Sequence, residues 1–182
     1  MEAADRLLAA GATPESLSLR AVAREAGVAA PSVYLQFENK DALIDAVVAK
    51  RFQQLADSVT ASIAGETDPY PRLLRGCEAY IAFARDHPSA YRMIFEINIP
   101  VPDPDAPTGR DVFQILVDAV QACLPADRAS PEQAFATATD IWVVMHGMVT
   151  LRRHLPAFPW PDTTAQLIGI FSALFPHLGT SR

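Results

Sequence analysis

Apolar residues recur along most of the chain at intervals of three and four, the spacing that places them on one face of an α-helix. Runs that alternate apolar and polar residues, which indicate β-strands, are nearly absent. The clearest stripe follows Asn39 and consists of Leu43, Val47, Val48, Phe52, Leu55, Val59 and Ile63. This pattern predicts an all-α protein of about nine helices.

Residues that begin or end helices divide the first half of the chain. The predicted helices cover residues 2–10, 19–26, about 30–37, 39–64 and 69–86, with a short sixth helix from Pro88. Gly11, Gly27 and Gly65 suit the ends of helices, because glycine readily takes the left-handed conformation found there. Ser18 and Asn39 carry side chains that cap the first turn of a helix.

The second half shows the same punctuation. The segment 97–107 holds too many prolines for a helix and is expected to be an extended loop. Thr108 is a candidate cap for a seventh helix that ends near Leu124. Ser130-Pro131-Glu132-Gln133 is a capping box with proline at the first helical position, and it predicts a helix up to His154. The proline-rich segment 155–161 then precedes a last helix over about 162–178.

The first 50 residues have the pattern of a helix-turn-helix domain, followed by a second domain over 51–182. Ala23 is small where two short helices would cross closely, and Gly27 suits a turn in which a side chain would clash. Val28 and Val33 are expected to pack into the three-helix core against Leu19. The third helix would then direct its other side chains outward, as a recognition helix does in a major groove.

The run LRAVAREAGVAAPSVYLQFENKDAL resembles the DNA-binding region of the tetracycline-repressor-like (TetR) family of transcriptional regulators. The resemblance covers roughly residues 2–50. Its shared features are the Ala-Gly-Val turn, Tyr34, Phe37, Lys40 and Leu43. Further along, Trp142-Val-Val-Met-His146-Gly147 resembles the Trp-His-Gly motif of one class of C-terminal domain in that family.

The resemblance implies a role in DNA binding for a set of residues around the turn. Ser32 and Tyr34 would contact phosphates or base edges, while Lys40 and Arg20 would hold the DNA backbone. Gln36 has an amide that can pair with adenine in the major groove, and Pro31 offers an apolar surface to a thymine methyl group. The expected DNA-binding set is Arg20, Ala30, Pro31, Ser32, Tyr34, Gln36 and Lys40. Packing for Tyr34 and simple solvation for Lys40 remain the alternative interpretations.

The helix-turn-helix domain over residues 1–50, which we call the head, departs from the family pattern in two ways. Ala29 stands where the family usually has Ser or Thr, so one backbone N–H is expected to lack a side-chain cap. Relatives commonly carry a short basic arm before the first helix, whereas here that helix begins next to Met1. Residues 1–50 hold five Lys or Arg against seven Asp or Glu, a formal charge of −2. Weak, salt-sensitive DNA binding is therefore expected.

The second domain has large, adaptable side chains with few charges, which suit either a core or an apolar ligand pocket. The expected pocket residues are Tyr80, Phe83, Tyr91, Phe95, Trp142, Met145 and His146. Gly147 in the middle of a helix costs about 1 kcal/mol relative to alanine, which suggests close approach of another backbone or of a ligand. His146 is either a hydrogen-bonded core residue or part of this pocket.

Apolar residues cover more than half of the circumference of the last helix. One side can face its own domain, and the other can meet the same helix of a second subunit, in a four-helix interface with two-fold symmetry. This agrees with the resemblance, in which the last two helices usually form the dimer. The expected interface residues are Leu167, Ile170, Phe171 and Leu174.

Several classes of function are not supported by the sequence. No nucleophile elbow, phosphate-binding loop or His-Glu-x-x-His motif occurs, and the four histidines have no evident catalytic partner. Cys77 and Cys123 lack the spacing of metal ligands and suit buried free thiols. No apolar run reaches the roughly 20 residues of a membrane span, and the N-terminus does not resemble a signal peptide. We expect a cytoplasmic protein without cofactor or metal.

The favoured hypothesis is a ligand-responsive transcriptional repressor. It would bind a palindromic DNA operator as a homodimer and be released by a small lipophilic or aromatic effector. A net charge of −6 argues against a non-specific polyanion binder but permits DNA recognition through a small, shaped surface. The alternatives are an all-α enzyme and a helical dimeric small-molecule-binding protein whose head no longer contacts DNA.

Overall fold

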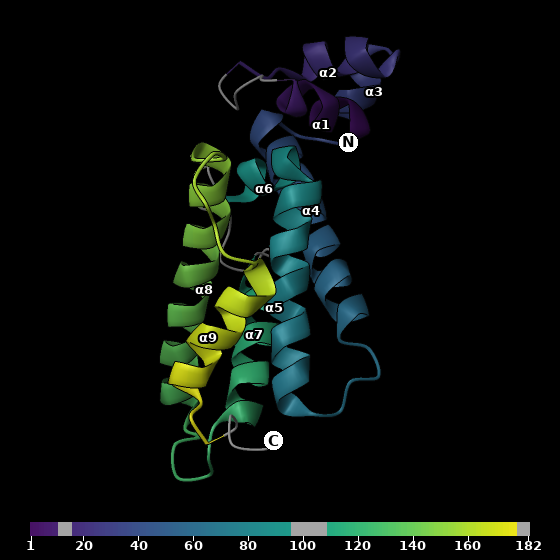
Figure 1. Ribbon diagram of the computed structural model, residues 1–182. Helices are drawn as coiled ribbons and strands as arrows, with labels where there is room; N and C mark the ends of the chain where they lie inside the picture. The colour runs from purple at the N-terminus through teal and green to yellow at the C-terminus, as the bar shows by residue number, and fades with distance from the viewer. Residues whose placement is uncertain (11–15, 96–108, 178–182) are drawn as a thin grey trace. The chain divides into compact units, whose positions relative to one another are not determined.

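The protein is described from a computed structural model that covers residues 1–10, 16–95 and 109–177 (Figure 1). Over these residues the chain is all-α: nine helices are present and no strand. They are α1 (Glu2–Ala9), α2 (Leu19–Ala26), α3 (Ala30–Tyr34), α4 (Lys40–Ser62), α5 (Pro69–Asp86), α6 (Pro88–Phe95), α7 (Gly109–Cys123), α8 (Pro131–His154) and α9 (Thr163–Leu174). The predictions for Gly11, the segment 97–107 and Thr108 lie outside the described residues. The last helix ends at Leu174, earlier than the predicted 178.

The ends of α2 and α8 have the capping residues that the sequence predicts. Ser18 Oγ accepts a hydrogen bond from the amide of Ala21 at 3.2 Å, and Ser130 Oγ accepts one from the amide of Gln133 at 3.2 Å. Gly27 ends α2 with a φ of 68°, in the left-handed region where a residue with a side chain is strained. The capping residues of α2 and α8 are thus correctly predicted from sequence.

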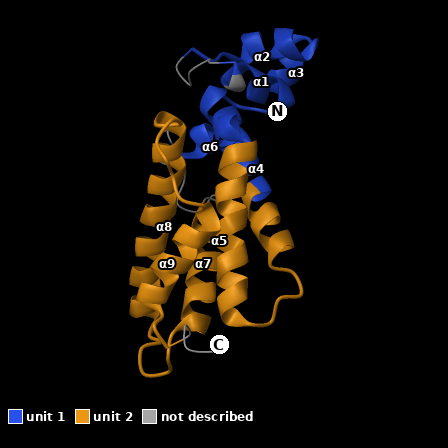
Figure 2. Cartoon of the chain, in the orientation of Figure 1, with its two compact units in different colours: residues 1–54, 87–108 blue, residues 55–86, 109–182 orange. Residues whose placement is uncertain are grey.

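The chain divides into two compact units, shown in blue and orange in Figure 2. Unit 1 comprises residues 1–54 and 87–108, and unit 2 comprises residues 55–86 and 109–182. Helix α4 contributes its first part to unit 1 and its last part to unit 2, and α6 belongs to unit 1.

Unit 1 has its own hydrophobic core, in which α2 packs against both α1 and α3. The core is formed chiefly by Ala4, Leu8, Val22, Ala23, Val33, Leu43, Ile44, Val47 and Met93. The Arg51 guanidinium of α4 donates two hydrogen bonds to the carboxylate of Asp5 in α1, one of them 2.8 Å long from Nε. Burial lowers the pKa of Arg51. This half-buried ion pair joins the first helix to the fourth.

The expectation that Val28 packs into this core is wrong, because its side chain is 47% exposed. Val28 lies in the turn after Gly27, where its amide donates to the carbonyl of Ala23 at 3.0 Å. Val33 is buried and Phe37, one turn later, packs against the same core, so these two residues supply the inward face of α3.

Unit 2 is built around α5, which contacts α7, α8 and α9. Its most buried side chains include Leu73, Cys77, Val120, Ala134, Ala138, Ile141, Leu167 and Phe171. The hydroxyl of Thr164 in α9 donates to the carboxylate of Glu78 in α5, so a polar contact supplements the apolar packing of these two helices.

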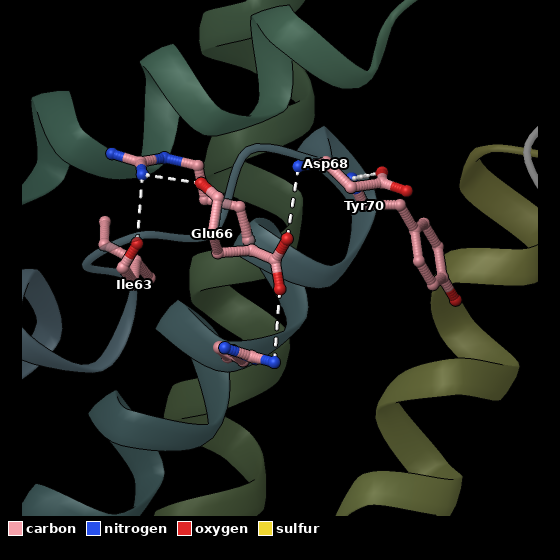
Figure 3. Close-up of polar contacts among 6 residues, drawn as sticks. Ile63, Glu66, Asp68 and Tyr70 are labelled. Carbon is pink, nitrogen blue, oxygen red and sulfur yellow. Dashed lines mark hydrogen bonds and ion pairs between the residues drawn. The ribbon is translucent and has the colours of Figure 1, made fainter.

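The corner between α4 and α5 is held by polar contacts (Figure 3). Glu66 Oε1 accepts from the amide of Asp68 at 3.2 Å, and its Oε2 lies 3.1 Å from Nη2 of Arg75. Asp68 Oδ1 in turn accepts from the amide of Tyr70 at 3.1 Å, at the start of α5. Arg72 donates to the backbone carbonyl of Glu66 at 3.3 Å. Side chains of α5 therefore fix the loop that precedes it.

Candidate DNA-binding surface and effector region

Helix α3 presents most of its side chains to solvent. Val33 and Phe37 face the core, whereas Pro31, Ser32 and Gln36 are exposed and Tyr34 is 51% exposed. Ala30, at the start of the helix, is half-buried and packs against the core. The helix ends at Tyr34, earlier than the predicted 37, so Gln36 follows α3 in an exposed position while Pro31, Ser32 and Tyr34 lie on it.

The start of α3 lacks a side-chain cap, as predicted from Ala29. The amide of Ser32 donates to the carbonyl of Ala29 at 3.0 Å, which begins the helix with a backbone bond instead. Pro31 fits here because a proline in the first turn has no amide that needs a partner. The first turn of α3 is therefore held by backbone geometry rather than by a polar side chain.

Two basic residues flank α3 in the sequence. Arg20 is exposed in the first turn of α2, and Lys40 is the half-buried first residue of α4. Asn39 Oδ1 accepts from the amide of Ala42 at 2.9 Å and so caps α4 where Lys40 begins it. A cation at each of these helix starts is suitably placed to hold a phosphate of the DNA backbone.

Sequence reasoning missed Leu35, which directly follows α3 and is 88% exposed. Its amide donates to the carbonyl of Pro31 at 3.0 Å, so it continues the helical turn. The signal was present in the sequence, because Pro31 and Leu35 are four residues apart and must share a helix face once Val33 and Phe37 face the core.

Aromatic side chains of α5, α7 and α8 meet in unit 2. Tyr80 Oη lies 2.9 Å from Nε2 of His146, and the His146 ring is 4.9 Å from that of Trp142. Phe113 of α7 contacts both Trp142 and Phe135, with ring centroids 5.4 Å apart in each pair. We call Tyr80, Phe113, Phe135, Trp142 and His146 the aromatic cluster. Three of its members were expected to line a pocket.

The remaining predicted pocket residues are distributed over both units. Phe83 and Met145 are buried in unit 2, with 4% and 2% of their surface exposed. Tyr91 and Phe95 belong to unit 1, where their rings are 4.9 Å apart and Phe95 also contacts Phe52 at 5.8 Å. The structure brings together Tyr80, Trp142 and His146 within unit 2, and it groups Tyr91 with Phe95 within unit 1.

Phe113 is a member of the cluster that sequence reasoning missed, whereas the spacing of Phe135 along its helix had indicated an inward position. Phe113 lies on α7, near the start of an apolar stripe that continues with Val117 and Val120. Phe135 is 57% exposed although it contacts Phe113. This cluster therefore extends from the interior of unit 2 to its surface.

Gly147 follows His146 in α8 and is half-buried. Leaving aside its own helix, no described atom lies within 4 Å of the position that a methyl group at Gly147 would take. The described residues thus supply no close backbone that would require a glycine. The close approach of another helix, one of the two predicted reasons for this glycine, is therefore not seen among the described residues.

The four residues expected at the dimer interface are placed differently from one another. Leu167 and Phe171 are almost fully buried in unit 2, so they have no free surface to offer a second chain. Ile170 is half-buried and Leu174 is 36% exposed. The exposed face of α9 carries small and apolar residues instead: Ala165, Ile168, Gly169, Ser172 and Ala173. Helix α8 exposes Val143 (63%) and Leu151 (48%).

Chemistry of other kinds finds little support in this structure. Among the described residues, no group of three or more His, Cys, Asp or Glu side chains is placed to hold a metal ion. Cys77 and Cys123 are buried free thiols, and burial raises the pKa of both. Helix α8 is long and apolar enough to cross a membrane by length and composition, but core helices of soluble proteins also meet that test.

Comparison with known proteins agrees with these features. The profile described as "Bacterial regulatory proteins, tetR family" matches residues 1–47. A second profile, "Tetracyclin repressor-like, C-terminal domain", matches residues 73–170, a span that includes the aromatic cluster and Gly147.

Solved structures share the fold. The candidate regulatory protein SCO4313 is 26% identical with a TM-score of 0.72, and the match covers 99% of this chain and 93% of that one. A protein of unknown function from Rhodococcus sp. RHA1 is 24% identical (TM-score 0.70; 94% and 92% covered). A candidate transcription regulator from Lactobacillus plantarum is 21% identical (TM-score 0.57; 93% and 92% covered). The chain therefore belongs to the TetR family of DNA-binding transcriptional regulators.

Proposed function

We propose that this regulator is a ligand-responsive repressor that binds a palindromic operator as a homodimer in the cytoplasm and is released by a small lipophilic or aromatic effector. The observation that carries the proposal is the arrangement of α3. Val33 packs in the core and Phe37, just after the helix, packs against it, whereas the other side chains of α3 are accessible and Arg20 and Lys40 flank the helix in the sequence.

On DNA, the accessible residues divide into two groups. Arg20, Ser32, Tyr34 and Lys40 carry donors suited to phosphates, and such contacts position the protein without reading sequence. Gln36 has the amide that pairs with adenine in the major groove. In a dimer, two recognition helices about 34 Å apart would enter successive major grooves, so the operator would be a palindrome.

The effector proposal is supported by the aromatic cluster. Tyr80 and His146 place a hydrogen-bonded polar pair among aromatic rings, an arrangement that suits an aromatic or lipophilic ligand with one polar group. Gly147 adjoins this pair, and an added methyl group there would meet no described atom outside its own helix. The effector would release DNA only through a higher affinity for the DNA-free state.

Dimer formation is supported by the exposed faces of α8 and α9. Val143 and Leu151 lie two helical turns apart on α8, and Ile168 and Gly169 lie on the outward face of α9. Small residues let helices approach closely, and apolar residues gain from burial. Ile168→Glu should therefore convert the dimer to a monomer in sedimentation analysis, whereas Ala122→Glu on the exposed face of α7 should not. A dimer that survives Ile168→Glu would contradict this interface.

Selection of bound fragments from a random duplex library, at two salt concentrations, tests the function as a whole. An enriched palindrome that still binds at moderate salt is the expected result, and it would also reveal the operator. A library that shows no enrichment even at low salt would contradict the proposal.

Fluorescence of Trp142 tests the effector site. Trp160 is the second tryptophan of the chain, and a Trp160→Phe variant leaves Trp142 as the single reporter. Aromatic acids, phenols and fatty acids form a suitable panel, and a compound that quenches Trp142 should also release the operator. Quenching should be lost in Tyr80→Phe for ligands that use the polar pair. A panel without any response would contradict a lipophilic effector.

A second candidate function is a dimeric small-molecule-binding protein whose head no longer contacts DNA. It is favoured by one observation, the formal charge of −2 over residues 1–50. The two candidates differ in the duplex selection, because only the regulator enriches a sequence, while both would bind the effector.

A further inference from the structure

The recognition helix has an apolar crest. With 100° of rotation per residue, Pro31 and Leu35 lie about 160° and 200° around the helix from Val33, which is buried. The hydrogen bond from the Leu35 amide to the Pro31 carbonyl, 3.0 Å long, shows that the helical turn continues through both. These two residues therefore form the line on α3 that lies farthest from the core, and we call it the apolar crest.

The crest is unusually open to solvent. Leu35 is 88% exposed, more than any other large hydrophobic residue in the described part of the chain. Val28, in the turn before α3, is 47% exposed. Exposed leucines occur singly on many surfaces, but this one occupies the part of the helix that would enter deepest into a groove. Its position therefore affects which bases the helix can recognise.

The chemistry of the crest limits what it can recognise. Leucine and proline side chains carry no hydrogen-bond donor or acceptor, so they cannot distinguish the polar edges of the bases. The major groove displays one apolar group that varies with sequence, the C5-methyl group of thymine. An apolar side chain gains free energy by burying that methyl group and gains nothing comparable from the other three bases.

We propose that Leu35, at the end of the crest, reads one thymine methyl group in each half-site of the operator. This inference rests on the proposed function and specifies it: the base beneath Leu35 is a thymine, and Gln36 and Ser32 supply polar contacts on either side. The formal charge of −2 over residues 1–50 increases the importance of such contacts, because phosphate attraction contributes less affinity.

Replacement of thymine by deoxyuridine tests the proposal, because the two differ in the methyl group alone. Each thymine of the selected operator is replaced in turn, in both half-sites together, and the dissociation constant of the full-length dimer is measured. One symmetry-related pair of thymines should lose about fourfold in affinity per methyl group, roughly 15-fold for the pair. All other replacements should change affinity little.

Two variants assign the effect to the crest. Leu35→Ala should remove the difference between thymine and deoxyuridine at that pair, whereas Leu35→Met, which keeps an apolar side chain of similar size, should retain it. Because the Leu35 side chain is exposed, both variants should melt within a few degrees of the wild type. A selective loss of methyl discrimination in Leu35→Ala is thus independent of folding.

Two results would overturn the inference while leaving the regulator intact. One is an operator in which deoxyuridine is tolerated at every position. The other is a Leu35→Ala variant that still discriminates fully between thymine and deoxyuridine. If this variant binds every duplex as the wild type does but no longer dimerises in sedimentation, the crest is a protein contact and the inference is likewise wrong. A library without any enriched duplex would refute the proposed function itself, and the inference with it.

Discussion

At the scale of single residues, the two cysteines show how burial controls reactivity. Desolvation, with a smaller contribution from the charge of Asp68, raises the pKa of the Cys123 thiol to about 12. Desolvation is also the main cause of the raised pKa of Cys77, followed by the charges of Cys123 and Glu78. The thiolate is the reactive form, so neither residue is suited to redox sensing in the folded protein.

The pH dependence of stability follows from these shifts. Well below the pKa of about 8.5 of a free cysteine, both thiols are protonated in the folded and in the unfolded chain, so they do not make the free energy of unfolding depend on pH there. As pH rises from about 8.5 toward 12, the unfolded chain ionises while the folded chain does not, and stability is lost. Between pH 8 and pH 10, the free energy of unfolding of the wild type, measured in urea, should fall by about 2 kcal/mol more than that of Cys123→Ala. Equal losses would show that Cys123 is accessible to water.

Tyr34 and Lys40 provide the second prediction at this scale. Each is expected to donate a hydrogen bond to a phosphate, and a bond to a charged group contributes roughly 1.5–3 kcal/mol. Tyr34→Ala and Lys40→Ala should therefore each weaken operator binding about tenfold or more, measured by fluorescence anisotropy. Both variants should remain dimers on a sizing column. Dissociation into monomers would show that the residue has a structural role instead.

At the scale of elements, the sequence predicted helices better than it predicted which way their side chains face. Ser18, Gly27 and Ser130 could be assigned because caps and left-handed turns depend on neighbours within four residues. Val28 could not, since a turn residue has no periodic partner that reveals its direction. Leu35 was overlooked because apolar character normally indicates burial, and here the inward positions of α3 were already occupied.

Contacts between elements were harder still to predict. Tyr80 and His146 are 66 residues apart, and no local pattern pairs them. Leu167 and Phe171 were expected at a dimer interface because the apolar face of α9 is broad, but its own unit buries them. An apolar stripe indicates that this face of the helix is buried, but it does not indicate whether the same chain or a second chain buries it.

Gly147 in α8 gives a prediction at this scale. In a helix interior, alanine is favoured over glycine by about 1 kcal/mol, and the added methyl group would meet no described atom within 4 Å outside α8. Gly147→Ala should therefore raise the free energy of unfolding by about that amount. Gly76→Ala in α5 is the matched control, because its methyl group would make only ordinary contacts, 3.5 Å from Ile63 and 3.8 Å from Val59.

The two glycine variants should differ in one respect. Gly147 adjoins His146, so Gly147→Ala should weaken quenching of Trp142 by an effector, and Gly76→Ala should leave that response unchanged. If Gly147→Ala instead lowers the free energy of unfolding, the space beside Gly147 is filled by a second chain.

At the scale of the whole molecule, the division into units differs from what hydrophobic pattern alone indicates. Sequence reasoning placed a boundary after residue 50, at a point inside a continuous helix. The structure groups α6 with unit 1, where Met93 is 2% exposed within the core of α1–α4. Periodicity identifies α6 as a helix with an apolar face, but only the three-dimensional arrangement determines which core that face joins.

Charge gives the last prediction, which concerns the intact dimer on DNA. Residues 1–50 hold five Lys or Arg, of which Arg20, Arg24 and Lys40 are the nearest to α3 in the sequence, and their formal charge is −2. If about five phosphates per dimer are neutralised, the slope of log K against log salt is about −4.5. Affinity for the operator should then fall roughly 500-fold between 50 and 200 mM salt. Lys40→Ala should make the slope shallower by about two, because one phosphate contact is lost per subunit. Leu35→Ala should lower the affinity and leave the slope unchanged. A slope of −8 or steeper would show that cations beyond these three hold the DNA.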